Sequence, residues 1–240
     1  MKIYWKLYYT DFPVDKILRQ THNPIREYED ELIEGAIIDI GCGQSSFLLD
    51  FINTDREIIA IDSEQIQLDF LRNRVKSQKN AKLENWTFQR SNFPVDKLPE
   101  KEYSLIIFSN ILHFFTLDEC IEIGKIVTKM SKKGTMVYAG VHSHKFYAND
   151  PKDPKNNDYF KHYFSIEDLE KVFPENEFER IYYAEIEKSD PQKERDLTEK
   201  WIEKSLEADG IIDPRRIELI KKNYMTNKCQ SDIISIFRKK

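Results

Sequence analysis

The sequence has few cysteines, and their number and spacing exclude several kinds of small stabilised domain. Cys42, Cys120 and Cys229 are odd in number and lie far apart, so they predict neither a disulfide framework nor a zinc knot. We therefore expect reduced thiols, which are typical of proteins that stay inside the cell. A cytoplasmic location is the corresponding prediction.

Long hydrophobic runs and a broad excess of positive charge are also lacking. No stretch approaches the roughly 18 apolar residues that a membrane-spanning helix needs. The aromatic N-terminal segment is interrupted by Lys2 and Lys6 and lacks the apolar centre of a signal peptide. The 37 Lys and Arg residues are outnumbered by 42 Asp and Glu residues, which leaves a net charge of -5. We therefore predict neither a membrane nor a nucleic-acid partner.

The sequence does contain a regular alternation of short apolar runs and amphipathic segments. Strands are predicted at 36–40, 57–62, 86–89, 103–110, 135–141, 178–186 and 231–237. Helices are predicted from Ser45 or Ser46 onward, at 64–77, at 117–130, after Ser165, from 190 to about 208, and from 213 to about 224. This alternation predicts an α/β fold with a doubly wound, mostly parallel seven-stranded sheet and helices on both faces.

The 240 residues suit a single α/β domain. Within it we expect an N-terminal cap segment at 1–30 and a two-helix insert at 188–229, before the last strand. Each insert helix has one apolar face, which is most often a packing surface. The insert is alternatively a substrate lid or the contact of a homodimer.

The first predicted strand runs into a glycine turn, Asp39-Ile40-Gly41-Cys42-Gly43. Glycines let the backbone turn sharply and approach a ligand closely. A dinucleotide fingerprint needs a third small residue, and this chain has Ser46 there. Asp62 closes the second strand, 21 residues after Gly41, where a carboxylate can accept hydrogen bonds from ribose hydroxyls. The pattern predicts an adenosine ligand, and NAD and S-adenosylmethionine both remain open.

Several motifs in order resemble those of class I S-adenosylmethionine-dependent methyltransferases. DIGCGQSSF is similar to their first motif, IIAIDSE to the second, WTFQRSNF and YSLIIFSNILHFF to the third and fourth, and KKGTMVYAGV to the segment of the fifth strand. Parts of HSHKFYAND and DYFKHYFSIEDLEKVF loosely resemble tellurite-resistance-type and related small-molecule methyltransferases. The resemblance implies S-adenosylmethionine as cofactor and an antiparallel final strand, with FERIYYAEI and SDIISIF as the last pair.

The resemblance also implies which residues bind the cofactor. Those expected at its methionine part and near the transferring methyl are Asp39, Gly41, Cys42, Gly43 and Asn110. Those expected at its ribose and adenine are Asp62, Ser63, Ser91, Asn92 and Phe93. An aspartate is common in the family where this chain has Asn92, whose amide can still pair with an adenine edge.

Histidines near the predicted cleft are candidates for catalysis and for substrate binding. His113 is a candidate general base, although a polar residue often follows this strand without doing chemistry. His142 and His144 follow the fifth strand and are expected to face the substrate, as is Tyr9. Two histidines at i and i+2 can contribute to a metal site, but no partnering Cys or carboxylate spacing supports one, so no metal is predicted. His162 is expected in a hydrophobic edge that packs on the following helix.

We predict methyl transfer to a small-molecule acceptor by in-line displacement. The small acceptor follows from the lack of a basic groove and of an appended nucleic-acid-binding module. A non-catalytic relative that binds the cofactor or a partner is one alternative. An NAD-dependent oxidoreductase is another, which Asp39, Ser46 and the arrangement of the final strands disfavour.

Overall fold

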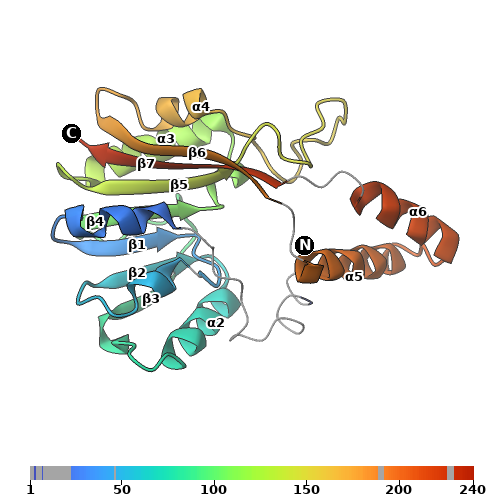
Figure 1. Cartoon of the computed structure of the whole chain (residues 1–240), viewed down its shortest axis with the longest axis horizontal. Helices are drawn as coiled ribbons and strands as arrows, with labels where there is room; N and C mark the ends of the chain where they lie inside the picture. The colour runs from blue at the N-terminus through green and yellow to red at the C-terminus, as the bar shows by residue number, and fades with distance from the viewer. Residues whose placement is uncertain (1–2, 4–6, 8–22, 46, 189–191, 226–229) are drawn as a thin grey trace.

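A seven-stranded sheet forms the centre of the computed structural model, which describes residues 3, 7, 23–45, 47–188, 192–225 and 230–240 (Figure 1). Its strands are β1 (Ala36–Ile40), β2 (Ile58–Asp62), β3 (Trp86–Arg90), β4 (Tyr103–Ser109), β5 (Met136–His142), β6 (Phe178–Lys188) and β7 (Gln230–Lys239). Their order across the sheet is β3-β2-β1-β4-β5-β7-β6. All seven strand predictions are confirmed.

Five strands are parallel neighbours and the last two are not. β3, β2, β1, β4 and β5 pair in parallel, whereas β7 lies antiparallel between β5 and β6. The antiparallel final strand is therefore confirmed. Because parallel strands end at one edge of a sheet, the loops after β1, β2, β4 and β5 meet there.

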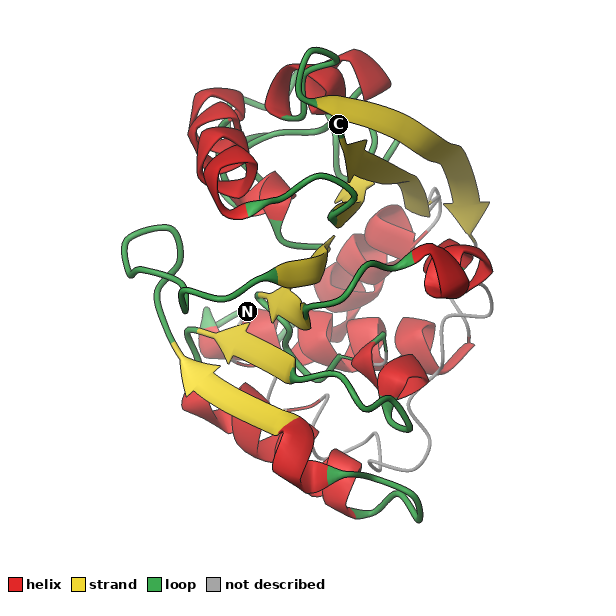
Figure 2. Cartoon of the chain, turned by 90° about the vertical axis from the view of Figure 1, so that its left-hand side faces the viewer, coloured by secondary structure: helices red, strands yellow, loops and turns green. Residues whose placement is uncertain are grey.

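Helices cover both faces of the sheet, as predicted (Figure 2). The α-helices are α2 (Gln65–Lys76), α3 (Leu117–Met130), α4 (Ile166–Val172), α5 (Gln192–Ala208) and α6 (Pro214–Met225). The 3-10 helices are η2 (Pro24–Glu31), η3 (Leu48–Phe51), η4 (Leu83–Asn85) and η5 (Leu112–Phe114). Ile38 packs with α3 and α4 on one face, whereas Ile37 packs with α2, η2 and η3 on the other. This alternation follows from the two-residue period of a strand.

The helices of the first face begin with side-chain caps. Ser165 caps α4 in a capping box with Asp168, as the sequence predicts, and Thr116 caps α3 in the same way with Glu119. The two helices approach closely at Gly124, where an added Cβ would lie 2.0 Å from the Val172 carbonyl oxygen. A glycine is therefore required at this contact.

The segment after the glycine turn differs from the prediction. A helix was expected from Ser45 or Ser46, but the structure has only the short 3-10 helix η3, and Ser46 lies outside the described residues. The reason is the distribution of apolar side chains. Phe47, Leu48, Leu49 and Phe51 are all buried, and a regular helix with one apolar stripe cannot bury so many neighbouring positions.

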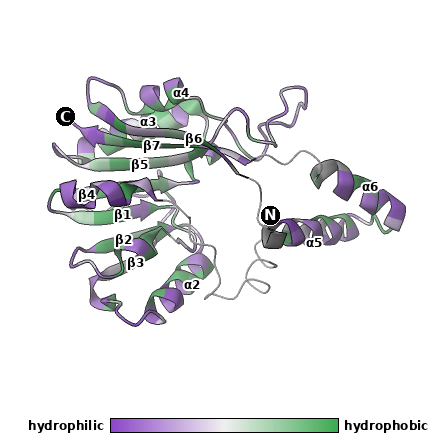
Figure 3. Cartoon of the chain, in the orientation of Figure 1, coloured by the Kyte–Doolittle hydropathy of each residue, from purple (hydrophilic) through white to green (hydrophobic). Residues whose placement is uncertain are grey.

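The two-helix insert lies beyond the carboxyl ends of the parallel strands (Figure 1). α5 and α6 mix hydrophilic and hydrophobic residues, whereas the central strands are mainly hydrophobic (Figure 3). Leu197 and Ile202 of α5 are buried. Lys221 of α6 contacts Glu203 of α5 at 2.8 Å and Glu218 at 3.1 Å, and these hydrogen bonds raise the pKa of the lysine. The bond to Glu203 links the two helices, whereas the bond to Glu218 lies within α6.

Candidate functional site

The glycine turn after β1 has a backbone shape that only glycine adopts easily. Gly41 has φ +70, and an added Cβ there would lie 2.7 Å from the Ile111 side chain. The Cys42 N–H donates to the Ile61 carbonyl oxygen at 2.9 Å, which holds the turn against the end of β2. The turn is therefore packed between the loop after β4 and the second strand.

Asp62 fixes the turn from the end of β2. One carboxylate oxygen accepts the Gly43 N–H at 2.8 Å, and the other accepts the Glu64 N–H at 2.9 Å. Burial raises the pKa of Asp62, although these backbone hydrogen bonds oppose the shift. A carboxylate has about four acceptor positions, so two further donors, such as ribose hydroxyls, can still bind.

Asp39 is a buried carboxyl beneath the same turn, with a relative exposure of 1%. Its Oδ2 accepts the Ser45 hydroxyl at 2.7 Å, and the Ser45 oxygen in turn accepts the Leu48 N–H at 3.0 Å. Oδ1 has no hydrogen-bond partner among the described residues. Burial raises the pKa of Asp39 to about 7, and the charge of Asp62 adds to this shift while the Ser45 hydrogen bond opposes it.

A cleft of about 100 Å³ opens beside this turn. It is lined by Ile40, Gly41, Ile61, Asp62, Ser63, Ser91, Phe93 and Ile111. The structure thus brings together five of the ten residues predicted to bind the cofactor. Cys42 and Gly43 belong to the turn and Asp39 lies near the end of β1, so these residues are close to the cleft in the chain but do not line it.

The two asparagines predicted for the cofactor site are both exposed. The backbone N–H of Asn92 donates to the Asp96 carboxylate at 2.7 Å, and this bond stabilises the loop after β3. Asn110 has φ +59 at the end of β4, and its N–H donates to the Gly140 carbonyl oxygen at 2.9 Å. Left-handed backbone at a non-glycine residue is uncommon and often marks a functional position.

Cys42 contributes a thiol that is buried and protonated. Burial raises its pKa well above the usual range, and the charges of Asp39 and Asp62 act in the same direction. The thiol donates to the Gly43 carbonyl oxygen at 3.6 Å. A protonated thiol is a poor nucleophile, so the side chain is suited to packing rather than to chemistry.

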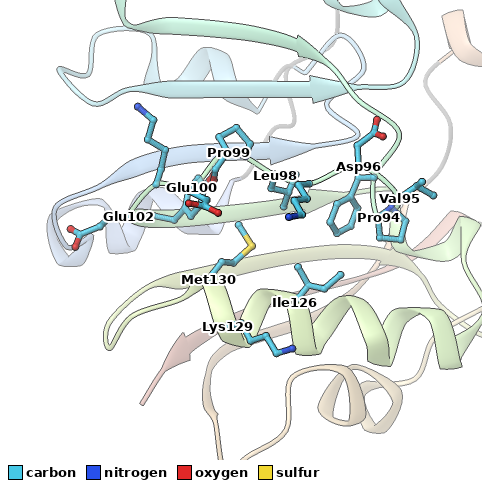
Figure 4. A pocket seen from close by; sticks show the side chains of 14 residues that line it. Pro94, Val95, Asp96, Leu98, Pro99, Glu100, Glu102, Ile126, Lys129 and Met130 are labelled. Carbon is cyan, nitrogen blue, oxygen red and sulfur yellow. The ribbon is translucent and has the colours of Figure 1, made fainter.

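A larger hollow of about 730 Å³ lies between the loop after β3 and α3 (Figure 4). Segment 94–102 lines one side, and Ile126, Lys129 and Met130 line the other. It shares Phe93 with the small cleft but extends to Tyr103 at the start of β4, whereas the small cleft lies at the carboxyl ends of the strands. We place the candidate site at the small cleft, because the glycine turn and Asp62 line it and the buried carboxyl of Asp39 lies beneath the same turn.

His113 and His142 form a buried stack rather than an open pair. Their rings are parallel with centroids 3.9 Å apart, and His142 stacks on Phe146 at 3.8 Å. Burial lowers the pKa of His113 well below its usual range, and His142 adds to this effect, so His113 is neutral. His142 lies opposite Asp232 in β7 and contacts it at 2.8 Å. The predicted roles of His113 as base and His142 as substrate contact stay predictions.

His144 points to a different set of partners. Its Nε2 lies 3.9 Å from Oδ2 of Asp168, and Nε2 of His162 lies 3.1 Å from the same oxygen. Lys171 contacts the other oxygen of Asp168 at 2.9 Å. Burial raises the pKa of Asp168, but hydrogen bonds from Lys171, Ser165 and His162 outweigh it and hold the pKa at about 2. Tyr9, the remaining predicted substrate residue, lies outside the described residues.

Three residues of these sites were missed from the sequence. Ser45 was considered only as a helix start, yet it holds the buried carboxyl of Asp39. Ile111 packs on Gly41 and lines the cleft. Asp232 pairs with His142, and the available signal was an acidic residue at the start of an otherwise apolar strand.

Comparison with family models assigns the chain. Residues 34–185 match the model described as "Methyltransferase domain". Because this match covers more than half of the chain, the protein belongs to that methyltransferase family. It is an enzyme whose cofactor is S-adenosylmethionine, so the choice between this cofactor and NAD is settled as predicted. Comparison with curated protein sequences finds no match.

Solved structures share the fold at low sequence identity. TehB from Haemophilus influenzae is 15% identical to this chain, with a TM-score of 0.61. The match covers 94% of this chain and 64% of the TehB chain. A SAM-dependent methyltransferase from Methanosarcina mazei is 15% identical, with a TM-score of 0.60, and the match covers 91% of this chain and 98% of that protein. Coclaurine N-methyltransferase, bound to N-methylheliamine and SAH, is 11% identical with a TM-score of 0.59, covering 89% and 72%. Each likeness concerns the fold.

Among the described residues, no helix has both the length and the apolar character needed to cross a bilayer. Cys42 and Cys120, the cysteines within the described part of the chain, are free and buried.

Proposed function

We propose that this methyltransferase transfers the methyl group of S-adenosylmethionine to a small-molecule acceptor by in-line displacement. The main observation in support of a cofactor site at the cleft is the pair of carboxyls, Asp39 and Asp62, around the glycine turn. Asp39 is buried and Asp62 is half-buried, and the charge of Asp62 raises the pKa of Asp39. A cationic ligand beside them relieves this repulsion.

The same electrostatics disfavour a dinucleotide. In a dinucleotide site the pyrophosphate lies at the glycine turn, and a helix N-terminus stabilises its charge. Here the turn is followed by the short helix η3, and two acidic side chains face it. S-adenosylmethionine instead has a sulfonium and an ammonium group, and the sulfonium makes its methyl electrophilic.

The residues of the cleft fit the predicted parts of the cofactor. The unpartnered Oδ1 of Asp39 supplies negative charge at the methionine side, together with Gly41, Cys42, Gly43 and Asn110. Asp62 has acceptor positions left for the ribose, with Ser63 beside it. Ser91, Asn92 and Phe93 follow β3 and complete the adenine side.

A small acceptor is favoured by the acidic balance of the chain, which has a net charge of -5. Coclaurine N-methyltransferase, which shares the fold, is bound to N-methylheliamine in its structure. His113 remains our candidate general base, and His142, His144 and Tyr9 remain our candidates for contacts to the acceptor. A cytoplasmic location and a homodimer are parts of the same proposal, the former supported by the free cysteines.

Isothermal titration calorimetry with S-adenosylmethionine, S-adenosylhomocysteine and NAD tests the cleft. We expect both adenosyl ligands to bind, and Asp62→Asn to weaken them at least about tenfold, the scale of a hydrogen bond to a charged group. Asp55→Asn removes a surface carboxylate that contacts Lys82 and is the matched control. Unchanged affinity in Asp62→Asn would exclude Asp62 from the site.

The acceptor is identified by incubating the protein with labelled S-adenosylmethionine and small-molecule extracts, and by searching for methylated products. Methylation of nucleic acid or protein alone would contradict the small-molecule proposal. Cofactor binding without any methylated product would favour a non-catalytic relative.

A further inference from the structure

We propose that His144, His162 and Asp168 form a binding site for a divalent metal ion of borderline softness, such as Zn²⁺. Their ligand atoms all lie within 4.8 Å of one another. Nε2 of His162 and Nε2 of His144 lie 3.1 Å and 3.9 Å from the same oxygen of Asp168. Ligand atoms bound to one tetrahedral zinc ion at about 2.1 Å are about 3.4 Å apart, so small side-chain movements suffice.

Backbone hydrogen bonds hold the three ligands in place. The Phe164 N–H donates to the His142 carbonyl oxygen at 2.9 Å, and the His144 N–H donates to the Phe164 carbonyl oxygen at 3.2 Å. Asp168 is the third residue of α4, where the Ser165 capping box fixes it. The loop after β5, which carries His144, and the segment 162–168, which carries His162 and Asp168, therefore present their side chains to one point, which is the arrangement that metal sites require.

The nature of the ligands selects the kind of metal. Two imidazole nitrogens and one carboxylate oxygen suit zinc, cobalt or nickel, whereas magnesium and calcium prefer oxygen ligands. The side chain of His144 is 56% exposed, so an ion can reach the site from solvent. The site lies outside the cofactor cleft, whose lining residues include none of the three.

Lys171 provides an internal test of this site. Its ammonium group contacts Oδ1 of Asp168 at 2.9 Å, whereas the histidines face Oδ2. The lysine therefore does not contact Oδ2, which accepts the Ser165 N–H at 3.2 Å and faces the histidines, but it places a positive charge close to the bound cation. Removing that charge strengthens metal binding if Asp168 is a ligand.

The experiment is calorimetry on untagged full-length protein that has been dialysed against EDTA and then against chelator-free buffer. We expect one Zn²⁺ ion to bind per chain, and Mg²⁺ not to bind. His144→Ala and His162→Ala are each expected to weaken Zn²⁺ at least about tenfold. Lys171→Gln is expected to tighten it about two- to fivefold, the scale of an exposed charge pair. Glu170→Gln, which removes another carboxylate from α4, is the control and should change nothing.

Circular dichroism checks that each variant folds, and exposed His144 can be replaced without opening the core. Co²⁺ as a probe separates this site from cysteine ligation, because thiolate ligands give intense charge-transfer absorption and imidazole ligands do not. Zn²⁺ affinity that is unchanged in His144→Ala, or a thiolate band with Co²⁺, would overturn the proposal. The cluster would then be an ion-pair network that supports the α4 cap.

Discussion

At the scale of single residues, burial sets the charge of the two carboxyls at the glycine turn. Asp39 is almost fully enclosed and shares one oxygen with Ser45, while its other oxygen has no partner among the described residues. A carboxyl in this state resists ionisation, which is why its pKa is about 7. The ionisation of Asp39 is therefore coupled to the binding of a cationic ligand.

This coupling predicts how cofactor affinity depends on pH. A cationic ligand favours the ionised form of Asp39, so affinity should rise as pH increases through 7 and level off above it. Between pH 6 and pH 8 we expect about a tenfold gain for S-adenosylmethionine, measured by calorimetry, since one proton is released on binding. Asp39→Asn, which cannot ionise, should bind more weakly at pH 8 and lose most of the gain. A flat wild-type profile would contradict the coupling.

At the scale of elements, side-chain caps decide where the helices of one sheet face begin. Thr116 accepts the Glu119 N–H at 3.3 Å, and Glu119 accepts the Thr116 N–H at 2.8 Å. These bonds pair backbone groups that a helix end leaves open. The helix α3 that they start contributes Cys120, Ile123 and Val127 to the core.

The cap predicts a stability change that does not depend on the cofactor. Thr116→Ala should lower the free energy of unfolding by about 1 kcal/mol, because the Glu119 N–H loses its partner. Thr128→Ala is the matched control, since Thr128 bonds the Gly124 carbonyl oxygen inside the same helix and caps nothing. Its change should stay within about 0.5 kcal/mol. Urea unfolding measures both, and equal losses would mean that the cap adds no stability of its own.

At the scale of the whole molecule, the insert interrupts two strands that are already neighbours. β6 and β7 are antiparallel and pair from Phe178 with Lys239 to Lys188 with Gln230. A two-residue turn could therefore connect them directly. The insert lies at the carboxyl edge of the sheet, the edge at which the glycine turn and the small cleft lie, and this placement favours the alternative that it is a lid (Figure 1).

Replacing residues 189–229 by Asn-Gly tests this arrangement. We expect the shortened protein to fold and unfold cooperatively, because the pairing of β6 with β7 is kept. Cofactor affinity should stay within about threefold, since no residue lining the cleft is removed. Sedimentation of both forms shows whether the insert is a dimer contact. Loss of cooperative unfolding would show instead that the insert, with its buried Leu197 and Ile202, belongs to the core.

Much of the fold was determined by the sequence alone. Apolar runs such as 36–40 and 103–108 are buried on both faces in the structure, so their pattern predicts strands without further information. The glycine turn and Asp62 were also predictable, because strand ends, glycines and acids have fixed positions relative to one another. The short 3-10 helix after the turn was not predictable, because the burial of four nearly adjacent apolar residues, 47–49 and 51, depends on how the whole fold packs around them.

What only the tertiary structure decided is which distant side chains meet. The sequence places His142 and His144 two residues apart and predicts that both face the substrate. The structure separates them: His142 pairs with Asp232 across the sheet, and His144 turns to His162 and Asp168. The physical reason is that local sequence sets the direction of each side chain, whereas strand order and register set its neighbours. The glycine turn is local and could be predicted, but the histidine cluster is assembled by the fold.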